Sequence, residues 1–320
     1  MDNTRLLKDL VRYGTLAASS HNTQCWRFQV NDQSITIQPD FSRRCPVVDP
    51  DDHHLYVSLG CAAENIWQAA KAHGLAGQVQ YETSGLGAVQ LTFAPCAPER
   101  TPLFEAIAQR QCSRTEYDGH PLQPEDLRLL AAAGTGDGVR VVMLSRPAEL
   151  KLVEEFVVLG NTVQLSNPAF VQELMTWIRF NKTEAERKGD GLYSAASGNP
   201  SLPRWLGRLI LPVVLRPQPE NEKYVRQLRS SAGVAVFVSD PSDRAHWVEV
   251  GRAYERFALQ ATALGIRNAF LNQPVEEAAL RPEFAKALGL GAGRPDLVVR
   301  FGRGPNMPRS PRRPLEAVLM

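Results

Sequence analysis

The chain has 320 residues, 43% of them hydrophobic and 22% charged, which is the composition of an ordinary globular protein. Its formal net charge of +2 gives no global electrostatic reason to expect binding to nucleic acid or membrane. The five cysteines are scattered without a C-x-x-C pair, and no run of about 18 apolar residues occurs. The first residues also lack the order of a secretory signal, so we expect a cytoplasmic protein with reduced thiols and no bound metal.

Hydrophobic periodicity predicts alternating helices and strands along the chain. The first hundred residues should contain a helix, a hairpin turning at Asn31 and Asp32, a long helix ended by Gly74, and two short strands. The expected ranges of these elements are 3–18, 26–38, 55–75, 77–82 and 88–94. Residues 95–102 contain prolines and are expected to form a linker.

The rest of the chain is expected to hold a second, larger set of elements. Helices are predicted at 103–111 and 124–133, followed by a strand at 139–144. Residues 147–230 should be mostly helical around a loop at 189–203. The remaining predicted elements are strand 233–239, helix 241–264, strand 267–271, helix 275–288 and strand 296–301. The proline-rich tail that follows must be extended for much of its length.

Two helical segments of the chain resemble each other. Residues 57–75 read VSLGCAAENIWQAAKAHGL and residues 248–266 read VEVGRAYERFALQATALGI, and Val, Gly, Ala, Glu, Ala, Ala and Gly coincide without a gap. Any two alanine-rich helices could match this well by chance. We favour an internal duplication, because both segments precede strands and the flanking elements agree in order. Duplicated halves indicate a dimer-like arrangement within one chain.

The stretch FEAIAQRQCSRTEYDGHPLQPEDLRLLAAAG, residues 104–134, contains a helix ending in Arg-x-x-x-Arg, an aromatic residue, a proline and a second helix. Arg110 and Arg114, near the helix end, could bind a phosphate through bidentate hydrogen bonds from their guanidinium groups. This segment resembles the start of the FMN-dependent nitroreductases, in which it holds the flavin phosphate. The stretch AASSHNTQCWRF, residues 17–28, resembles a second motif of that family, the Pro-Ser-Ser-x-Asn-x-Gln-Pro-Trp turn, which reaches the flavin from the neighbouring subunit.

The two motifs stand in an unusual order. The first half of the chain has the turn but no arginine motif before it, and the second half has the arginine motif but reads AAAGTGDGVRVVML where its own turn should follow. This arrangement resembles the fused double-unit, Acg-like FMN-binding proteins. The resemblance implies an α+β fold in which a unit at 1–100 and a unit at 101–320, each an antiparallel-rich sheet with helices, join along two long helices. It also implies one complete flavin site per chain and a degenerate second site.

The resemblance further implies which residues meet the FMN. The candidates are Ser19, Ser20, Asn22, Gln24, Arg110, Cys112, Arg114, Asn272, Gln273, Arg312 and Arg313. Asn272 and Gln273 fall where the family places a loop against the flavin ring, although a strand-end turn capped by Asn explains them equally well. The tail has six arginines and one acid from 294 to 313, and it is either solvated or neutralises the phosphate through Arg312 or Arg313. For Cys112, a weak bond to the phosphate and a space-filling role both stay open.

Residues 161–225 are long for an insertion in this fold, and they carry Trp177, Arg179 and Tyr193 as candidates for substrate contact. The insertion forms either an extra packing layer or a lid over the flavin. We favour a lid, because long irregular segments in compact domains are often functional.

Three other patterns have simpler explanations. Ser20 beside His21 suggests a nucleophile with its base, but adjacent residues rarely align in this way and no G-x-S-x-G elbow occurs. The stretch DPDDHH, residues 49–54, suggests metal ligation, and an acidic cap for the following helix explains its aspartates better. Trp26 is expected in the core rather than against the flavin.

The resemblance implies an FMN-dependent oxidoreductase, in which NAD(P)H reduces the flavin and a nitroaromatic, quinone or similar small acceptor then takes the electrons in a ping-pong reaction. A competing expectation is a protein that sequesters FMN beneath a closed lid without turnover. A third is a flavin-free structural protein whose motifs have decayed. Because one chain already holds a dimer-like arrangement, we expect a monomer or a weak homodimer, with no nucleic-acid or membrane partner.

Overall fold

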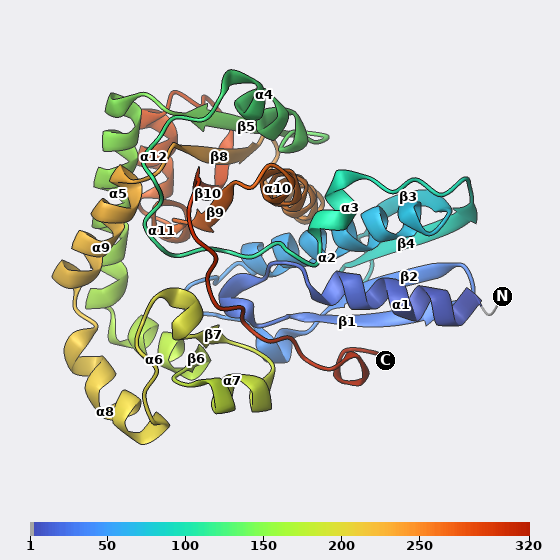
Figure 1. The fold of residues 1–320 in the computed structure, drawn as a ribbon, viewed down its shortest axis with the longest axis horizontal. Coiled ribbons are helices and arrows are strands. Elements are labelled where there is room, and N and C mark those ends of the chain that lie inside the picture. Colours follow the sequence, from blue (N-terminus) through green and yellow to red (C-terminus); the bar gives the residue numbers. More distant parts are fainter. Residues whose placement is uncertain (1–2) are drawn as a thin grey trace.

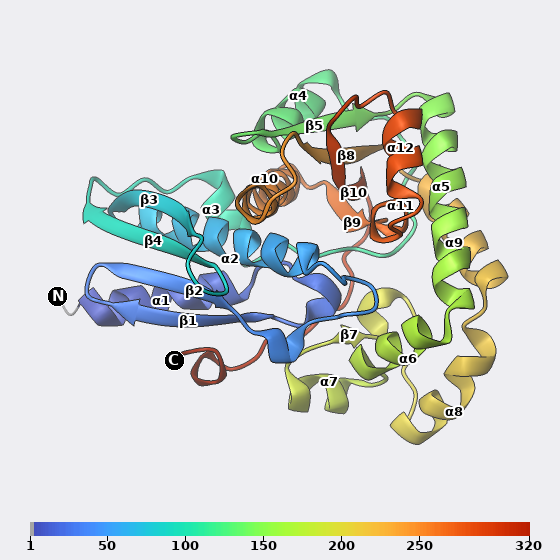
Figure 2. The same cartoon turned by 180° about the vertical axis from the view of Figure 1, so that it is seen from behind.

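A computed structural model describes residues 3–320 and shows two antiparallel sheets on either side of a pair of long helices (Figures 1 and 2). The predicted first unit starts at residue 1, and residues 1 and 2 lie outside the described part. The predicted α+β class, with antiparallel sheets around long central helices, is confirmed.

The first sheet contains β1 (Trp26–Asn31), β2 (Ser34–Pro39), β3 (Leu75–Glu82) and β4 (Ala88–Pro95) in the order β1-β2-β4-β3. All three pairs are antiparallel, and the predicted hairpin is confirmed by the pairing of Trp26 with Pro39. Buried and exposed residues alternate at the start of β1, as expected for a strand with one face in the core. Helices α1 (Asn3–Thr15) and α2 (His53–Ala72) pack against this sheet.

The second sheet contains β5 (Val139–Leu144), β8 (Gly233–Ser239), β9 (Arg267–Phe270) and β10 (Arg294–Gly302) in the order β5-β8-β10-β9. Its pairs are again antiparallel. Within each sheet the strands therefore lie in the same order, first, second, fourth and third along the chain. This shared order supports the internal duplication. Helices α4 (Pro124–Ala133) and α10 (Arg244–Ala263) pack against the second sheet.

Helices α2 and α10 pack directly against each other, as predicted from the two related segments. A Cβ atom added at Gly60 would lie 1.9 Å from the carbonyl oxygen of Val248, and one added at Gly251 would lie 1.9 Å from that of Val57. Val57 and Gly60 are the repeat equivalents of Val248 and Gly251. The contact is therefore reciprocal, as across the two-fold axis of a symmetric dimer.

The two sheets differ in how their first and second strands are connected. Strands β1 and β2 are joined by a tight turn, whereas residues 145–232 separate β5 from β8. Residues 145–232, which include the predicted insertion at 161–225, are called the insertion from here on and form the left and lower part of Figure 1. Its elements are α5 (Pro147–Ser166), α6 (Pro168–Trp177), β6 (Ile178–Arg179), α7 (Lys182–Lys188), β7 (Leu192–Tyr193), α8 (Arg204–Val214) and α9 (Pro217–Arg229). Strands β6 and β7 form a small parallel pair.

Two predicted helices are wrong in extent. The helix predicted at 275–288 is split into α11 (Gln273–Glu276) and α12 (Arg281–Ala287), because Pro274 and Pro282 each begin a new first turn. The helix predicted at 103–111 is shorter, since α3 spans only Pro102–Ala106. After it the backbone continues in tighter i to i+3 turns, as helix ends commonly do.

The C-terminal tail leaves the second sheet and ends on the first. Residues 303–314 contain no helix or strand, as predicted, and a short turn of helix follows at Leu315–Ala317. The N–H of Phe28 then donates to the carbonyl of Val318 at 2.8 Å, and the N–H of Met320 donates back to Phe28 at 2.9 Å. Figure 1 shows this red segment crossing from β10 to the side of β1.

Candidate functional site

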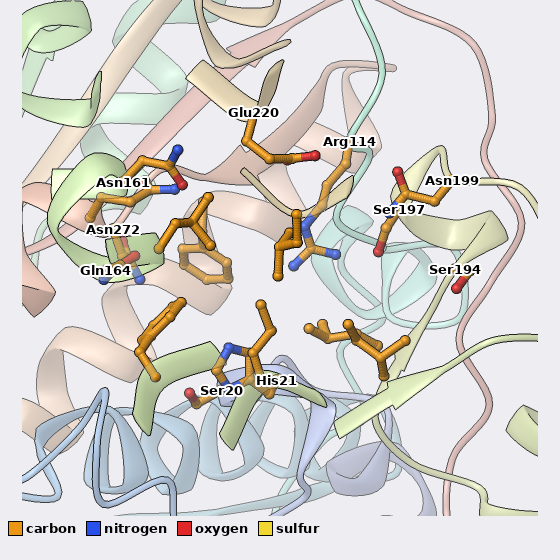
Figure 3. Close-up of a pocket in the computed structure, with 18 of the residues that line it drawn as sticks. Ser20, His21, Arg114, Asn161, Gln164, Ser194, Ser197, Asn199, Glu220 and Asn272 are labelled. Carbon is orange, nitrogen blue, oxygen red and sulfur yellow. The ribbon is translucent and has the colours of Figure 1, made fainter. Parts of the chain in front are cut away.

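A cavity of about 360 Å³ lies between the start of α2, the loop after β9 and the insertion (Figure 3). Its volume is within the range of small-molecule sites in proteins. Helix α2 contributes His54, Val57, Ser58 and Cys61, which share one face at helical spacing. The insertion forms most of the apolar wall, with residues that include Phe170, Leu174, Ile178, Phe180, Leu192 and Leu211.

The Ser19–Gln24 turn reaches the cavity with Ser19, Ser20 and His21. His21, Asn22 and Gln24 have φ values of 46°, 52° and 53°, a left-handed conformation that non-glycine residues adopt at a cost. The backbone N–H of Ser20 donates to Ser58 Oγ at 3.2 Å, and that of Gln24 donates to Ser19 Oγ at 3.0 Å. The surrounding structure thus holds a strained turn against the cavity, a common property of functional sites.

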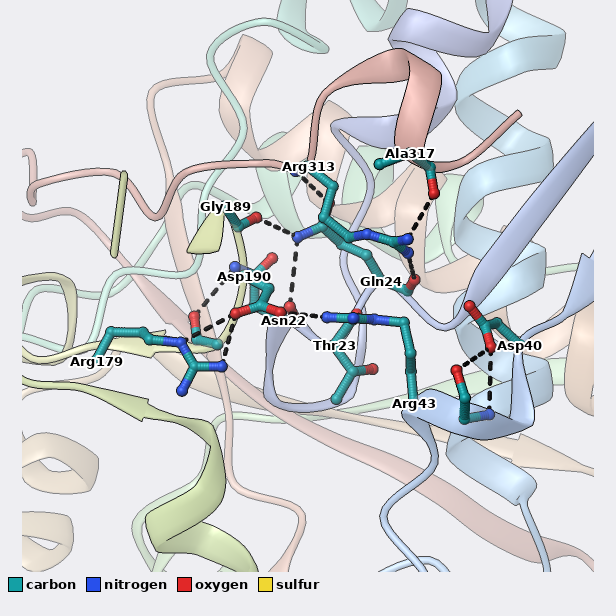
Figure 4. A network of polar contacts seen from close by, with 12 residues as sticks. Asn22, Thr23, Gln24, Asp40, Arg43, Arg179, Gly189, Asp190, Arg313 and Ala317 are labelled. Atoms are coloured by element: carbon teal, nitrogen blue, oxygen red, sulfur yellow. Dashed lines mark hydrogen bonds and ion pairs between the residues drawn. The ribbon is translucent and has the colours of Figure 1, made fainter. Parts of the chain in front are cut away.

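The side chains of Asn22 and Gln24 take partners away from the cavity wall (Figure 4). Asn22 Nδ2 donates to the carbonyl of Gly191 at 3.1 Å, and Gln24 Nε2 donates to that of Gly189 at 2.7 Å. Gln24 Oε1 accepts from the backbone N–H of Arg313 at 2.8 Å, and the Arg313 side chain donates to the Gln24 carbonyl. These residues therefore tie the turn to the insertion and to the C-terminal tail.

The two arginines of the Arg-x-x-x-Arg motif separate in the structure. Arg114 lines the cavity, and Figure 3 shows its guanidinium pointing into it. Within residues 3–320, no hydrogen bond or ion pair engages that guanidinium. Arg110 is buried instead, with Nε 2.8 Å from Glu255 Oε1 and Nη2 donating to the carbonyl of Leu16 at 2.8 Å. Its distance from the cavity follows from this pair, since a buried carboxylate needs a cation beside it.

Arg312 and Cys112 also lie apart from the cavity wall. Arg312 donates to the carbonyls of Thr15 and Leu16 at 3.0 Å and 3.1 Å, which satisfies the C-terminal end of α1. Burial, and next the neighbouring Arg110, lower the pKa of Arg312 to about 10. The thiol of Cys112 lies 3.7 Å from the hydroxyl of Tyr254.

The loop after β9 supplies another part of the cavity wall. Asn272 and Gln273 both line it, as expected from their position after the strand. Asn272 Oδ1 accepts from the N–H of Val298 at 3.0 Å. Gln273 Oε1 is buried and accepts no hydrogen bond from any residue in the described part of the chain.

Titratable residues that the sequence did not predict as site residues also face the cavity. Burial raises the pKa of Glu276 to about 7, although Gln164 Nε2 donates to its carboxylate at 2.8 Å. Burial, and next the charge of Arg114, lower the pKa of His21 to about 4, and burial also holds the pKa of His54 well below its usual value. Glu276 stands two residues after Pro274 and Gln164 lies in an apolar helix, so neither had a motif to mark it.

The three predicted lid residues do not line the cavity, but their neighbours do. Arg179 pairs with Asp190 at 2.6 Å, and the ring of Trp177 lies under the guanidinium of Arg43 at 5.4 Å. Tyr193 pairs with Arg179 across the β6–β7 pair. Successive residues of a strand point to opposite faces, so Ile178 and Leu192 face the cavity in their place.

The structure also shows the surroundings of the remaining motifs. Asp49 accepts from the backbone N–H groups of His54 and Leu55 at 3.0 Å each, so it caps α2. Trp26 is fully buried in the core. The His21 ring lies 3.5 Å from Cys45 Sγ, and no bond joins it to Ser20 in residues 3–320. Over the same residues, no group of three or more His, Cys, Asp and Glu side chains is placed to hold a metal ion.

The chain is similar over nearly its full length to two proteins of Mycobacterium tuberculosis (strain ATCC 25618 / H37Rv). It is 26% identical over 319 residues to "Putative NAD(P)H nitroreductase Rv3131", covering 95% of this chain and 88% of that protein. It is 24% identical over 336 residues to "Putative NAD(P)H nitroreductase acg", covering 99% and 96%. The predicted resemblance, including Acg-like relatives, is confirmed.

No family model matches the chain. Solved structures with some likeness include the FMN-dependent nitroreductase NfnB from Mycobacterium smegmatis in complex with NADPH, at 15% identity and a TM-score of 0.44, covering 68% of this chain and 96% of that one. A nitroreductase with bound FMN from Bacteroides fragilis NCTC 9343 has 15% identity and a TM-score of 0.39, covering 67% and 95%. Both TM-scores are low.

The repeat equivalents of the cavity-lining Ser58 and Cys61 are Glu249 and Arg252. These two form an ion pair at 2.8 Å, and Arg256 donates to Glu249 at 2.9 Å. The loop after α4, which takes the place of the Ser19–Gln24 turn, packs onto this network, because a Cβ at Gly136 would lie 2.4 Å from Glu249 Oε1. Charged pairs therefore occupy the positions that form a cavity wall in the other half.

Proposed function

We propose that this chain is an FMN-dependent oxidoreductase that takes electrons from NAD(P)H. The observation that carries the proposal is a convergence of segments far apart in sequence on one cavity. The cavity is lined by Ser19 and Ser20 of the turn, Arg114 of the arginine motif, and Asn272 and Gln273 of the loop after β9. These are predicted flavin-binding residues, and the two named relatives are NAD(P)H nitroreductases by name.

The residues of the cavity fit FMN chemically. Arg114 offers a guanidinium without a protein partner among the described residues, and such a fork suits a phosphate. Gln273 Oε1 is a buried acceptor without a donor, which a ring N–H would satisfy. The apolar side chains of the insertion provide a surface against which a flat aromatic ring would be desolvated.

When bound, FMN would supply the redox chemistry by accepting a hydride equivalent and passing on electrons. The protein would bind and orient the cofactor. In this proposal Arg114 holds the phosphate, while Ser19, Ser20, Asn272 and Gln273 contact the cofactor directly. The other predicted residues hold the turn and the neighbouring helix ends in place and do not contact the cofactor. They are Asn22, Gln24, Arg110, Cys112, Arg312 and Arg313.

We further propose which molecule accepts the electrons and how the chain is divided. A nitroaromatic, quinone or similar small acceptor suits the apolar wall, and donor and acceptor would use the same cavity in turn, which gives ping-pong kinetics. We also propose that residues 1–100 and 101–320 are the two units of a duplicated chain, which binds one FMN as a cytoplasmic monomer or weak homodimer. The ion pairs at Glu249 and Arg252 support a single site.

A second candidate is a protein that sequesters FMN without turnover. The observation that favours it is the share of the cavity wall supplied by the insertion, which covers the site like a lid. Adding NADPH or NADH anaerobically to the FMN-loaded protein separates the two. The oxidoreductase predicts rapid bleaching of the flavin band near about 450 nm, restored by a quinone or nitroaromatic. Bleaching by dithionite alone would support sequestration, and a colourless protein that takes up no added FMN would contradict both.

A further inference from the structure

Helix α8 has two different apolar edges. Gly207, Ile210 and Leu211 line the cavity. On the other edge Trp205 and Leu209 are 70% and 68% exposed, the largest exposures among the described hydrophobic side chains of appreciable size. They are four residues apart, so they stack into one row on the helix surface. The helix lies at the periphery of the molecule, away from both sheets in both views (Figures 1 and 2).

The charged side chains of α8 and of the segments directly before and after it are all basic. Residues 191–219 contain no Asp or Glu and carry Arg204, Arg208 and Arg216. Arg204 pairs with Glu184 at 3.2 Å, while Arg208 and Arg216 are exposed and make no side-chain hydrogen bond or ion pair within residues 3–320. Arg204 and Arg208 are also four residues apart. A row of two arginines, of which Arg208 is unpaired among the described residues, therefore runs beside the apolar row of Trp205 and Leu209.

We propose that α8 docks this protein on an anionic lipid surface. An apolar stripe flanked by arginines is the pattern of helices that lie in the membrane interface. Tryptophan favours that interface because its ring is amphipathic, and arginine can bury its aliphatic stem while its head meets lipid phosphates. Along the described chain no helix has the length and apolarity to cross a bilayer, so the contact is a surface contact.

A second copy of the chain is a poorer occupant of the same face. In a two-fold pairing through α8, the rows of Arg204 and Arg208 of both copies would meet, and like charges would repel. The proposal is independent of the flavin chemistry. It also revises the expectation of no membrane partner, which came from the net charge of the whole chain and not from the local charge of this helix.

The test is sedimentation of the full chain with vesicles. The protein should pellet with vesicles that contain phosphatidylglycerol and phosphatidylcholine, and not with phosphatidylcholine alone. Binding should weaken about tenfold when salt rises from about 0.1 M to about 0.5 M, because the attraction is electrostatic. Leu209→Glu should weaken it about tenfold or more. No binding of the unchanged chain to anionic vesicles would overturn the proposal.

Leu86→Glu is the matched control, because Leu86 is 63% exposed and lies in the turn between β3 and β4, far along the chain from α8. It adds the same charge and should leave vesicle binding unchanged. Equal losses in both variants would overturn the assignment to α8. Light scattering then gives the oligomeric state of both variants. If Leu209→Glu dissociates a dimer and leaves vesicle binding intact, the exposed row is a self-association surface and the proposal fails.

Discussion

Glu64 of α2 and Glu255 of α10 occupy equivalent positions in the two related helices, and both are buried and paired with arginine. Glu64 lies 3.2 Å from Arg252 and 3.0 Å from Arg256, both on the opposite helix. Glu255 instead meets Arg110, which comes from the Arg-x-x-x-Arg motif after α3. Two equivalent glutamates therefore have different roles. Glu64 belongs to the ion pairs that fill one half of the dimer-like arrangement. In the other half, Glu255 accepts from the backbone N–H of Ala18, just before the turn that reaches the cavity.

Arg110→Ala should destabilise the fold. Removing one partner of a buried pair leaves Glu255 uncompensated, which lowers the free energy of unfolding by about 3–5 kcal/mol. Urea denaturation followed by circular dichroism measures this loss. Arg128→Ala, which removes an exposed pair with Glu125, is the control and should change little. Normal stability together with lost FMN binding would place Arg110 on the phosphate instead.

Arg114→Ala should act on the cofactor and not on the fold. Its guanidinium has no partner in the described part of the chain, so its removal leaves no buried group unpaired. FMN affinity should fall by about 1.5–3 kcal/mol, the scale of hydrogen bonds to a charged group, with the unfolding curve unchanged. Fluorescence titration with FMN gives the affinity. Equal affinities of Arg114→Ala and the unchanged chain would refute the phosphate assignment.

Gly60→Ala should weaken the contact between α2 and α10. The new methyl group would meet the backbone carbonyl of Val248 at 1.9 Å, and a backbone atom in a helix moves only at a cost. The expected loss is about 1–3 kcal/mol in unfolding free energy. Gly14→Ala is the comparison, because its methyl group would press on the side chain of Ile66 at 2.9 Å and would meet the nearest backbone atom, the Ala62 oxygen, only at 3.5 Å. A larger loss at Gly14 would argue against a close reciprocal contact.

Glu276 should make stability depend on pH in a defined direction. Burial raises its pKa from 4.5 in the unfolded chain to about 7 in the fold. The folded state therefore binds more protons than the unfolded state between these values, so its contribution to stability is complete below the lower value and is lost as pH rises to about 7. His21, with its pKa lowered to about 4, gives the opposite trend. The difference in unfolding free energy between the unchanged chain and Glu276→Gln isolates the contribution of Glu276.

That difference is measured by urea denaturation at several pH values. The groups that face Glu276 are Gln164, Asp49, Glu277, Arg281 and His54, and all remain in the variant. Relative to Glu276→Gln, the unchanged chain should lose stability as pH rises from about 4.5 to about 7. A difference that grows in the opposite direction would show that Glu276 is ionised in the fold at neutral pH.

The sequence was sufficient for the parts of the fold that rest on periodicity. The coincidence of Val57 and Gly60 with Val248 and Gly251 predicted two paired helices, because a shared pattern implies a shared packing face. The strand order of the two sheets was not predicted, and its agreement between the sheets supports the same repeat. The split at Pro274 and Pro282 was missed, although both prolines were visible, because the apolar period continued through them.

The candidate site was only partly predictable. The spacing of Arg110 and Arg114 indicated two cations near a helix end, but it contained no information on where each side chain would point. That outcome depends on Glu255, which lies on a distant helix. Asn22 and Gln24 were likewise placed by partners in the insertion and the tail. Long-range contacts of this kind decide which polar residues of a motif face a cavity.

Equilibrium titration with FMN, followed by flavin fluorescence and by the flavin-to-protein ratio of the purified complex, tests the central claim most directly. Because the positions equivalent to this cavity's wall are filled by ion pairs in the other half of the dimer-like arrangement, we expect a ratio of one. Arg114→Glu should abolish that binding, because it places a carboxylate against the phosphate. A ratio near two, or undiminished binding by Arg114→Glu, would contradict the assignment of a single flavin site to this cavity.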